Sequence, residues 1–352
     1  MYHAKVQILF LISDKLEHKI SRIIRNTLKF LIPLCCGIAI CWALYSKLDM
    51  SQIVRILQSE IKYGWVLLSM VVGVLSHVVR AMRWQLQLRA LGRPIPFRTL
   101  TNAIFGTYAM NLVFPRLGEV WRCGYVNRRE NIPFTLLLGS VVSDRLMDTL
   151  SVMLLTMAVF FLQMHVLLDF LAQYPVIKDT ALSLLTSPYP YLLLVACIGV
   201  IVWLFRQKND HRWVMKVKEM FRNLWAGIRT VLTMRQKGRF LFYTILLWGC
   251  YYLQLYFCIF AFADTEYLGA LAALSLFVMG SISMGIPVQG GLGPWHLAVM
   301  ATLTIYGVTD NNVAGSFALV AHGSQMVVII LLGIYTLFSI LFEKKRENIP
   351  TE

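Results

Sequence analysis

Charged residues are scarce in this chain of 352 residues. Only 14% are Asp, Glu, Lys or Arg, whereas 58% are hydrophobic, and the mean hydropathy is +0.64. A single soluble domain of this length does not need so many apolar side chains to fill its core. The composition therefore excludes an ordinary soluble protein and predicts a protein of the membrane.

Familiar catalytic and metal-binding motifs are also absent. The sequence contains no His-Glu-x-x-His pair, no Walker phosphate loop, and no Ser, His and Asp in the order and glycine context of a hydrolase. The seven cysteines show no Cys-x-x-Cys spacing and lie mostly in apolar segments, which is typical of small buried residues. We therefore expect no enzyme, no metal ion and no cofactor.

Acidic residues are outnumbered, with 18 Asp and Glu against 33 Lys and Arg and a net charge of +15. An excess of this sign can indicate nucleic acid, but here the basic residues gather in blocks between apolar runs, as orientation signals do. Residues 80–132 and 206–239 are strongly basic, whereas residues 165–188 contain only Lys178 and residues 263–267 contain no base. We predict that both termini and both basic loops are cytoplasmic, and that no nucleic acid binds.

Apolar runs of spanning length predict an all-α polytopic membrane protein with about six full spans. We place the spans at residues 28–46, 64–88, 134–164, 189–206, 239–262 and 313–342, between a cytoplasmic amphipathic segment at 1–27 and a cytoplasmic tail at 343–352. Two further apolar runs, near 99–122 and 268–308, are interrupted by proline and glycine, and the first also by charge. Neither can cross lipid as one helix, so we predict two re-entrant helical hairpins, one from each face.

The two interrupted runs resemble each other, which suggests an internal duplication. At a nearly constant offset along the chain, Gly73 aligns with Gly249, Gly106 with Gly280, Gly118 with Gly293, and Gly139-Ser140 with Gly315-Ser316. We predict a first repeat at 28–164 and a second at 189–342. Because each contains three crossings, the second must be inverted, as in many transporters. Chance alignment of small residues is the alternative.

The break in the first hairpin carries unusual charge. Arg116, Glu119 and Arg122 surround Gly118, where a new helix is expected to begin and to present unpaired backbone amides. A helix start beside two arginines suits an anion such as a lipid phosphate. In the alternative interpretation, Glu119 pairs with Arg116 or Arg122 and only neutralises the tip of the hairpin.

Three more charges occur in the long helix that follows. Asp144 and Asp148 share a face at a spacing of four, and Arg145 lies three residues before Asp148, so we expect a neutralised internal cluster turned away from lipid. Charges at this depth in a membrane indicate function. The alternative is a bridge that serves packing alone.

Basic residues at the end of the second span form another candidate group. Arg80 and Arg83 follow His77 at threefold spacing on one side of the helix. They are either substrate-binding residues or arginines whose side chains extend to the cytoplasmic surface without any ligand.

The second repeat has candidates of its own. His322 falls close to the position of Arg145, and either titrates during transport or serves as a hydrogen-bonded structural histidine. The remaining candidates surround the second break: Pro287, Gly290, Gly291, Gly293 and His296.

Four motifs together resemble the lysylphosphatidylglycerol synthetase transmembrane family, which includes the flippase half of aminoacyl-phospholipid synthetase/flippases and single-domain bacterial membrane proteins. They are Arg80-x-x-Arg83-Trp84, Pro115-Arg116-Leu117-Gly118-Glu119-x-x-Arg122, Asp144-Arg145-x-x-Asp148 and Pro287-x-x-Gly290-Gly291-x-Gly293. The resemblance covers residues 28–342 and implies the transport region alone, in a bacterial inner membrane. The chain departs from the family pattern after the second glycine turn, where a frequent Glu is replaced by Pro294-Trp295-His296.

These observations lead us to expect a flippase-like lipid transporter. It would move a lipid with an anionic or phosphate-bearing headgroup between leaflets, through a polar groove between the hairpins. The alternatives are a small-anion transporter or channel and an intramembrane transferase that uses Asp144 and His322. The expected partners are membrane lipids, with a second copy of the chain and a separate lipid-synthesising enzyme as further candidates.

Overall fold

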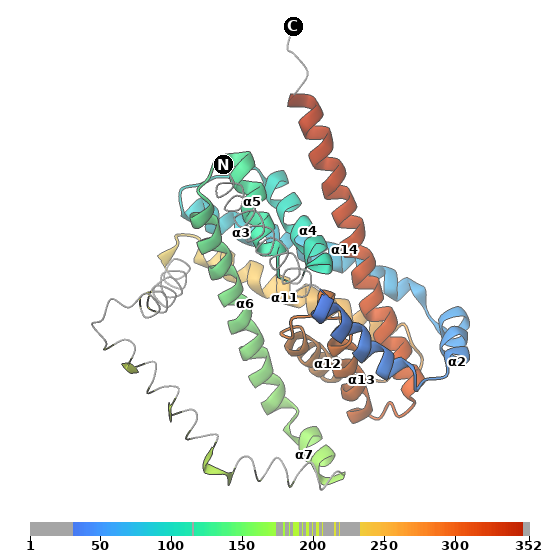
Figure 1. Cartoon of the computed structure of the whole chain (residues 1–352). Helices are drawn as coiled ribbons and strands as arrows, with labels where there is room; N and C mark the ends of the chain where they lie inside the picture. Colours follow the sequence, from blue (N-terminus) through green and yellow to red (C-terminus); the bar gives the residue numbers. More distant parts are fainter. Residues whose placement is uncertain are drawn as a thin grey trace, which may run out of the picture.

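The computed structural model describes residues 31–114, 116–173 and 233–347, with isolated positions between 179 and 218. The described part is helical and contains no strand, only an isolated bridge between Ile61 and Phe262. In chain order the helices are Leu31–Tyr45, α2 (Met50–Arg55), the π-helical turn η1 (Ile56–Glu60), α3 (Tyr63–Ala90), α4 (Phe97–Val113), α5 (Gly118–Glu130), α6 (Phe134–Leu162), α7 (Met164–Gln173), α11 (Lys237–Ile259), α12 (Ala270–Ser283), the 3₁₀ turn η2 (Gln289–Gly291), α13 (Pro294–Ile305) and α14 (Asn311–Glu347) (Figure 1).

Four of these helices are long and apolar enough to cross a membrane: α3, α6, α11 and the part of α14 up to Phe342. They match the predicted spans at 64–88, 134–164, 239–262 and 313–342. The amphipathic segment at 1–27 lies outside the described residues, as does more than half of the predicted span at 189–206. Six spans therefore stay a prediction, while an all-helical, multi-pass architecture is confirmed.

The first predicted span, at 28–46, is one helix over its described residues, and the connection after it differs from expectation. Leu31–Tyr45 is followed by a second helical stretch, Met50–Glu60, at an angle of 93° to it. Asp49 starts this stretch, because its carboxylate accepts hydrogen bonds from the backbone amides of Ser51 and Gln52. Residues 50–60, predicted as a polar connection, are thus largely helical.

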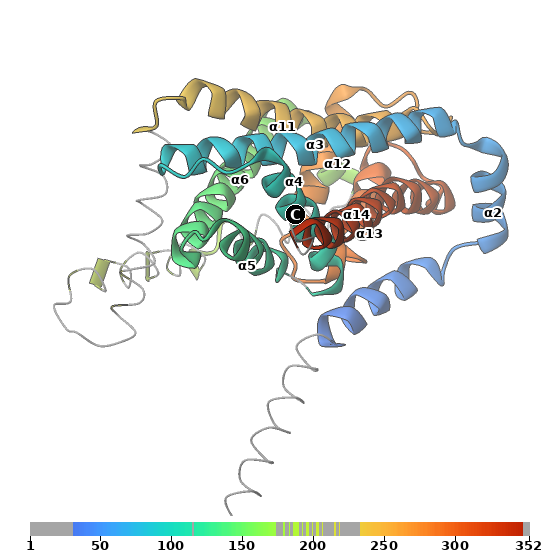
Figure 2. The same cartoon turned by 90° about the horizontal axis from the view of Figure 1, so that it is seen from above.

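Helices α3 and α11 lie side by side along one edge of the fold (Figure 2). Their close approach depends on small residues. Gly73 of α3 lies so near the amide group of Gln254 that a Cβ atom there would collide with it, and the Ser69 hydroxyl donates to the Gln254 carbonyl at 2.7 Å. Packing through small residues is the usual way in which helices associate inside a membrane.

Two broken helical hairpins pack next to this pair. Helix α4 packs against α5, and α12 packs against α13 after the turn η2. In both hairpins a glycine lies against an indole ring, Gly106 on Trp121 and Gly280 on Trp295, leaving no room for a Cβ atom without movement. Each predicted hairpin is therefore present as a helix-break-helix unit, although its re-entry into a membrane stays a prediction.

The helices also repeat in order. The series α3, α4, α5, α6 is followed by α11, α12, α13, α14, and the two series contact each other crosswise: α4 packs on α14, and α12 packs on α6. The matched contacts support the predicted duplication. The inverted orientation of the second repeat stays a prediction.

The two breaks meet each other. Arg116, just before α5, donates to the carbonyl of Gly285 at 2.6 Å, and Leu112 lies against Gly290. The helix Leu31–Tyr45 also contacts the second break, where Gly37 and Gly293 approach closely. Segments far apart in the chain thus form one junction between the hairpins.

Candidate functional site

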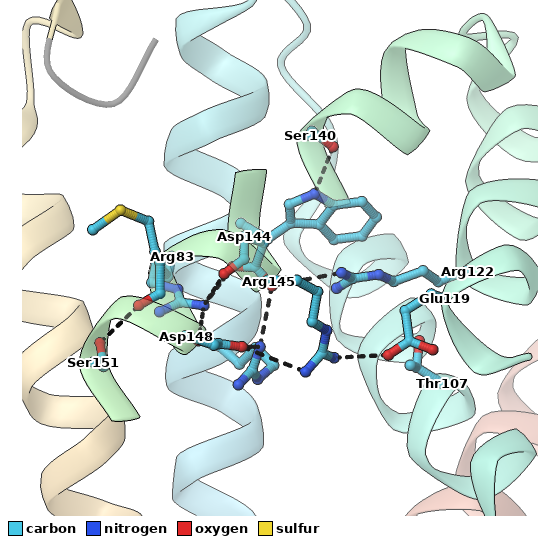
Figure 3. A network of polar contacts seen from close by, with 12 residues as sticks. Arg83, Thr107, Glu119, Arg122, Ser140, Asp144, Arg145, Asp148 and Ser151 are labelled. Atoms are coloured by element: carbon cyan, nitrogen blue, oxygen red, sulfur yellow. Dashed lines mark hydrogen bonds and ion pairs between the residues drawn. The ribbon is translucent and has the colours of Figure 1, made fainter. Parts of the chain in front are cut away.

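Seven charged side chains converge between α3, α5 and α6, and we call them the charge network (Figure 3). The network consists of Arg80 and Arg83 from α3, Glu119 and Arg122 from α5, and Asp144, Arg145 and Asp148 from α6. Spacings of three or four residues place the charges of each helix on one face. All seven were predicted as site residues, but as separate groups.

The two aspartates form the centre of the network. Asp144 is fully buried, and its carboxylate contacts Arg80 at 3.1 Å, Arg122 at 3.5 Å, and also Arg83. Asp148 contacts Arg80 at 2.8 Å and Arg83 at 2.7 Å. Two guanidinium groups from α3 therefore bridge both carboxylates of α6. Each bridge offsets the desolvation that a buried ion would otherwise suffer.

Two of the alternatives considered for the sequence are wrong. The Arg80 and Arg83 residues are only 2% and 0% exposed, so they do not extend to a membrane surface. Glu119 pairs with neither Arg116 nor Arg122, but with Arg145 at 3.1 Å. The reason is tertiary: Arg122 turns inward to Asp144, and Arg116 turns away to the second hairpin.

Arg145 has a different position from the one predicted. It reaches Asp148 at 3.4 Å, but the partners of Asp144 are the arginines of α3 and α5. The Arg145 side chain is 37% exposed and its partner Glu119 is 20% exposed. This pair forms the outer edge of the network, and Arg145 is not its main neutralising charge.

The network carries more positive than negative charge. Four guanidinium groups face three carboxylates, an excess of +1. Among the described residues, Nε and Nη1 of both Arg83 and Arg122 have no hydrogen-bond partner. Arg122 also lies over the Trp84 ring at 4.8 Å, and the Trp84 indole donates to Ser140 at 2.9 Å. Buried donors without acceptors are rare, and these four nitrogens could bind an acceptor such as an anion or a water molecule.

Two tyrosines extend the network, Tyr108 from the first repeat and Tyr251 from the second. Arg80 Nε donates to the Tyr251 hydroxyl at 3.2 Å, which lies 3.0 Å from the Tyr108 hydroxyl. The Tyr108 ring packs on His77 at 4.2 Å. Our sequence reasoning missed both tyrosines. The repeat does not mark Tyr251, because the offset that relates Gly73 to Gly249 relates His77 to Leu253.

The start of α5 is less open than predicted. The Gly118 amide donates to the Asn111 side chain of α4 at 2.8 Å, so one of the expected free amides is already bonded. A Cβ atom at Gly118 would collide with the Thr107 carbonyl, which explains the glycine. The structure therefore offers the donors of Arg122, more than this amide, as the candidate anion contact.

The second break brings together the other predicted candidates. Gly290, Gly291 and Gly293 have φ angles of 58°, 78° and 91°, a conformation that favours glycine. After this turn, which Pro287 precedes, the His296 ring meets the His322 ring edge-on, with centroids 4.7 Å apart. The described residues show no hydrogen bond or ion pair joining these two histidines to the charge network.

Comparison with known proteins places the chain in a family. The sequence profile described as "Lysylphosphatidylglycerol synthase TM region" matches residues 27–333. Glycosyltransferase AglD of Haloferax volcanii is 33% identical over 106 residues, which cover 30% of this chain and 17% of the relative. A UPF0104 membrane protein of Methanocaldococcus jannaschii is 24% identical over 110 residues, 30% of this chain and 32% of the relative. The matches thus span less than a third of either relative.

Proposed function

Because the chain belongs to the family of the lysylphosphatidylglycerol synthase TM region, we propose that it moves lipids between the leaflets of a membrane. The lipid has an anionic or phosphate-bearing headgroup. We propose a bacterial inner membrane, as the family resemblance implies, and cytoplasmic termini, which the basic loops favour. The observation that carries the proposal is the excess of buried guanidinium donors in the charge network.

The chemistry of these donors suits a phosphate. A guanidinium group presents a planar fork of N–H donors that matches phosphate oxygens, and such charge-assisted bonds are stronger than neutral ones. Arg122 donates to Asp144 through Nη2, while its Nε and Nη1 have no acceptor among the described residues. A headgroup with one negative charge would fill them and cancel the excess of +1.

The outer pair provides a way in. Arg145 and Glu119 are the most exposed members of the network, and Glu119 stands one helical turn from Arg122 on α5. A phosphate that replaces Glu119 as the ion-pair partner of Arg145 would lie next to Arg122. The acyl chains would stay in lipid, which the apolar outer surface of α6 favours through Met153, Leu154 and Phe161, all exposed.

An intramembrane transferase is the second candidate, favoured by the partial match to a protein named as a glycosyltransferase. The contacts of Asp144 argue against the roles first considered for it. Three arginines hold its carboxylate, which makes it a poor base, and His322 belongs to the separate second break. The arrangement therefore favours transport of the lipid over its chemical modification.

The test uses the full chain in liposomes that contain fluorescent phosphatidylglycerol, with an external quencher that reports the outer leaflet. We expect the transport rate to fall roughly ten- to a hundredfold in Arg122→Gln, because a hydrogen bond to a charged group contributes about 1.5–3 kcal/mol. Arg145→Gln, which removes a partly exposed side chain, should also slow transport. Arg89→Gln is the matched control, since Arg89 is exposed at the end of α3.

Three outcomes would contradict the proposal. Normal transport in both Arg122→Gln and Arg145→Gln would place the headgroup site elsewhere. Chloride flux without lipid movement would favour the small-anion channel. A chemically altered lipid, detected by mass spectrometry, would favour the transferase.

A further inference from the structure

We propose that His296 and His322 form a proton-binding site that couples lipid movement to proton movement. This inference rests on the proposed function and adds an energy source to it. The two side chains come from different helices, α13 and α14, and both are buried, with 3% and 2% exposure. The charge network has no part in this pair.

Ring contacts and one hydrogen bond fix the positions of the two histidines. His322 stacks on Trp295 at 5.0 Å and meets His296 edge-on at 4.7 Å. Nε2 of His322 lies 2.9 Å from the Gly290 carbonyl, which can only accept, so Nε2 carries a hydrogen. His296 Nδ1 has no hydrogen-bond partner in the described part of the chain. The His322 ring is therefore held by a hydrogen bond, whereas the His296 ring has a nitrogen that lacks a partner among the described residues.

The groups facing the pair include no carboxylate. From the helix Leu31–Tyr45, the Tyr45 ring meets His296 at 5.9 Å, and Cys41 lies against the Gly293 backbone. Helix α12 has no titratable side chain, and α13 has none besides His296. Among the described neighbours, a proton taken up by the pair would therefore have no counter-ion. An anionic headgroup is the partner that such a charge would attract.

Alignment of the two repeats relates these histidines to arginines of the charge network. The offset that relates Gly106 to Gly280 also relates Arg122 to His296, and His322 falls near the position of Arg145. The first repeat thus carries permanent charges at or next to positions where the second carries two imidazoles, whose charge depends on whether they bind a proton. A headgroup passing from one repeat to the other would leave a fixed positive site for one that is positive only when protonated.

A change in the protonation of the pair would also affect the second hairpin, through the contact of His322 with its glycine turn. The Gly290 carbonyl that binds His322 belongs to the glycine turn, and this turn touches Leu112 of the first hairpin and Gly37 of the first helix. A ligand whose binding displaces His322 would therefore also displace the junction between the two breaks. Proton and lipid would move together, towards the side of higher pH.

The first measurement tests proton binding alone, before and after phosphatidylglycerol is added. Purified full-length protein with ¹³C-labelled histidine is titrated by NMR, and His296→Gln and His322→Gln identify the two signals. Because a buried imidazole without a counter-ion resists protonation, we expect both signals to stay fixed between about pH 5 and pH 8 in lipid-free protein, and at least one to shift over this range once the anionic lipid is present. If neither signal moves in the presence of the lipid, the proposal is overturned.

The second measurement tests coupling in liposomes at clamped pH. In the wild-type protein, transport of fluorescent phosphatidylglycerol should rise about tenfold as the pH falls from about 8 to about 5.5. His296→Gln and His322→Gln should transport at a rate that does not depend on pH, whereas the exposed His165→Gln control keeps the dependence. A wild-type rate that ignores pH would overturn coupling. A titrating pair in a protein that moves no lipid would instead reject the proposed function and leave the proton site standing.

Discussion

The strongest test of the charge network is a double-mutant cycle between Arg83 and Asp144. Both side chains are fully buried, and Arg83 contacts Asp144 and Asp148 together. Arg83→Met would leave two carboxylates sharing Arg80, and Asp144→Asn would leave three arginines facing Asp148. Removing one partner of a buried ion pair costs about 3–5 kcal/mol, because the other charge stays in a medium of low dielectric constant.

The double variant decides between a coupled network and separate ions. If the residues interact as the structure shows, Arg83→Met with Asp144→Asn should lose less stability than the two single losses added together, and the coupling should reach about 2 kcal/mol or more. This exceeds the average of about 0.6 kcal/mol for hydrogen bonds between membrane helices. The exposed pair Lys62 and Glu266 is the control cycle, where we expect about 0–1 kcal/mol.

The measurement is the free energy of unfolding in mixed detergent micelles, followed by tryptophan fluorescence as sodium dodecyl sulfate is added. Both cycles are measured in the same micelles, so that the shared effects of detergent cancel. A coupling below about 0.5 kcal/mol between Arg83 and Asp144 would refute the reasoning. The carboxylate would then be separately hydrated, and the buried network would not exist.

Three further predictions follow from the same contacts. Arg145→Leu should cost only about 1 kcal/mol of unfolding free energy, because Asp148 keeps Arg80 and Arg83; a loss as large as that of Arg83→Met would show that Arg145 is the main neutralising charge. Gly106→Ala and Gly280→Ala should each lower the melting temperature, since a Cβ atom would meet Trp121 or Trp295, whereas Gly139→Ala and Gly249→Ala, which have open space, should not. In a cysteine-free background, an impermeant thiol reagent added outside cells should label a cysteine at position 165 and not one at position 128, and the reverse pattern would reject the predicted topology.

Much of the helical framework was predictable because it depends on local properties. The length of an apolar run predicts a crossing helix, and four such runs became α3, α6, α11 and α14. Proline, glycine and charge inside an apolar run predict a break, and both breaks are present as packed hairpins. The glycine and tryptophan positions that the two repeats share also became matching contacts, Gly106 on Trp121 and Gly280 on Trp295.

The pairing of the charges was only partly predictable. Spacing along one helix grouped Asp144 with Arg145, which is the only relation that a single helix can reveal. The actual partners of Asp144 come from α3 and α5, 64, 61 and 22 residues away in the chain. In the second repeat, each histidine was noticed alone, and their contact depends on how α13 packs against α14.

Composition, run length and the positions of breaks made this chain an all-helical membrane protein with two interrupted hairpins, because lipid requires each crossing segment to satisfy its own backbone. They also placed charges where lipid alone could not hold them. Tertiary packing decided which charge meets which, and brought His296 to His322. The physical reason is that a buried ion must find a counter-ion wherever the packed helix faces provide one, and those faces are set by contacts between helices distant in the chain.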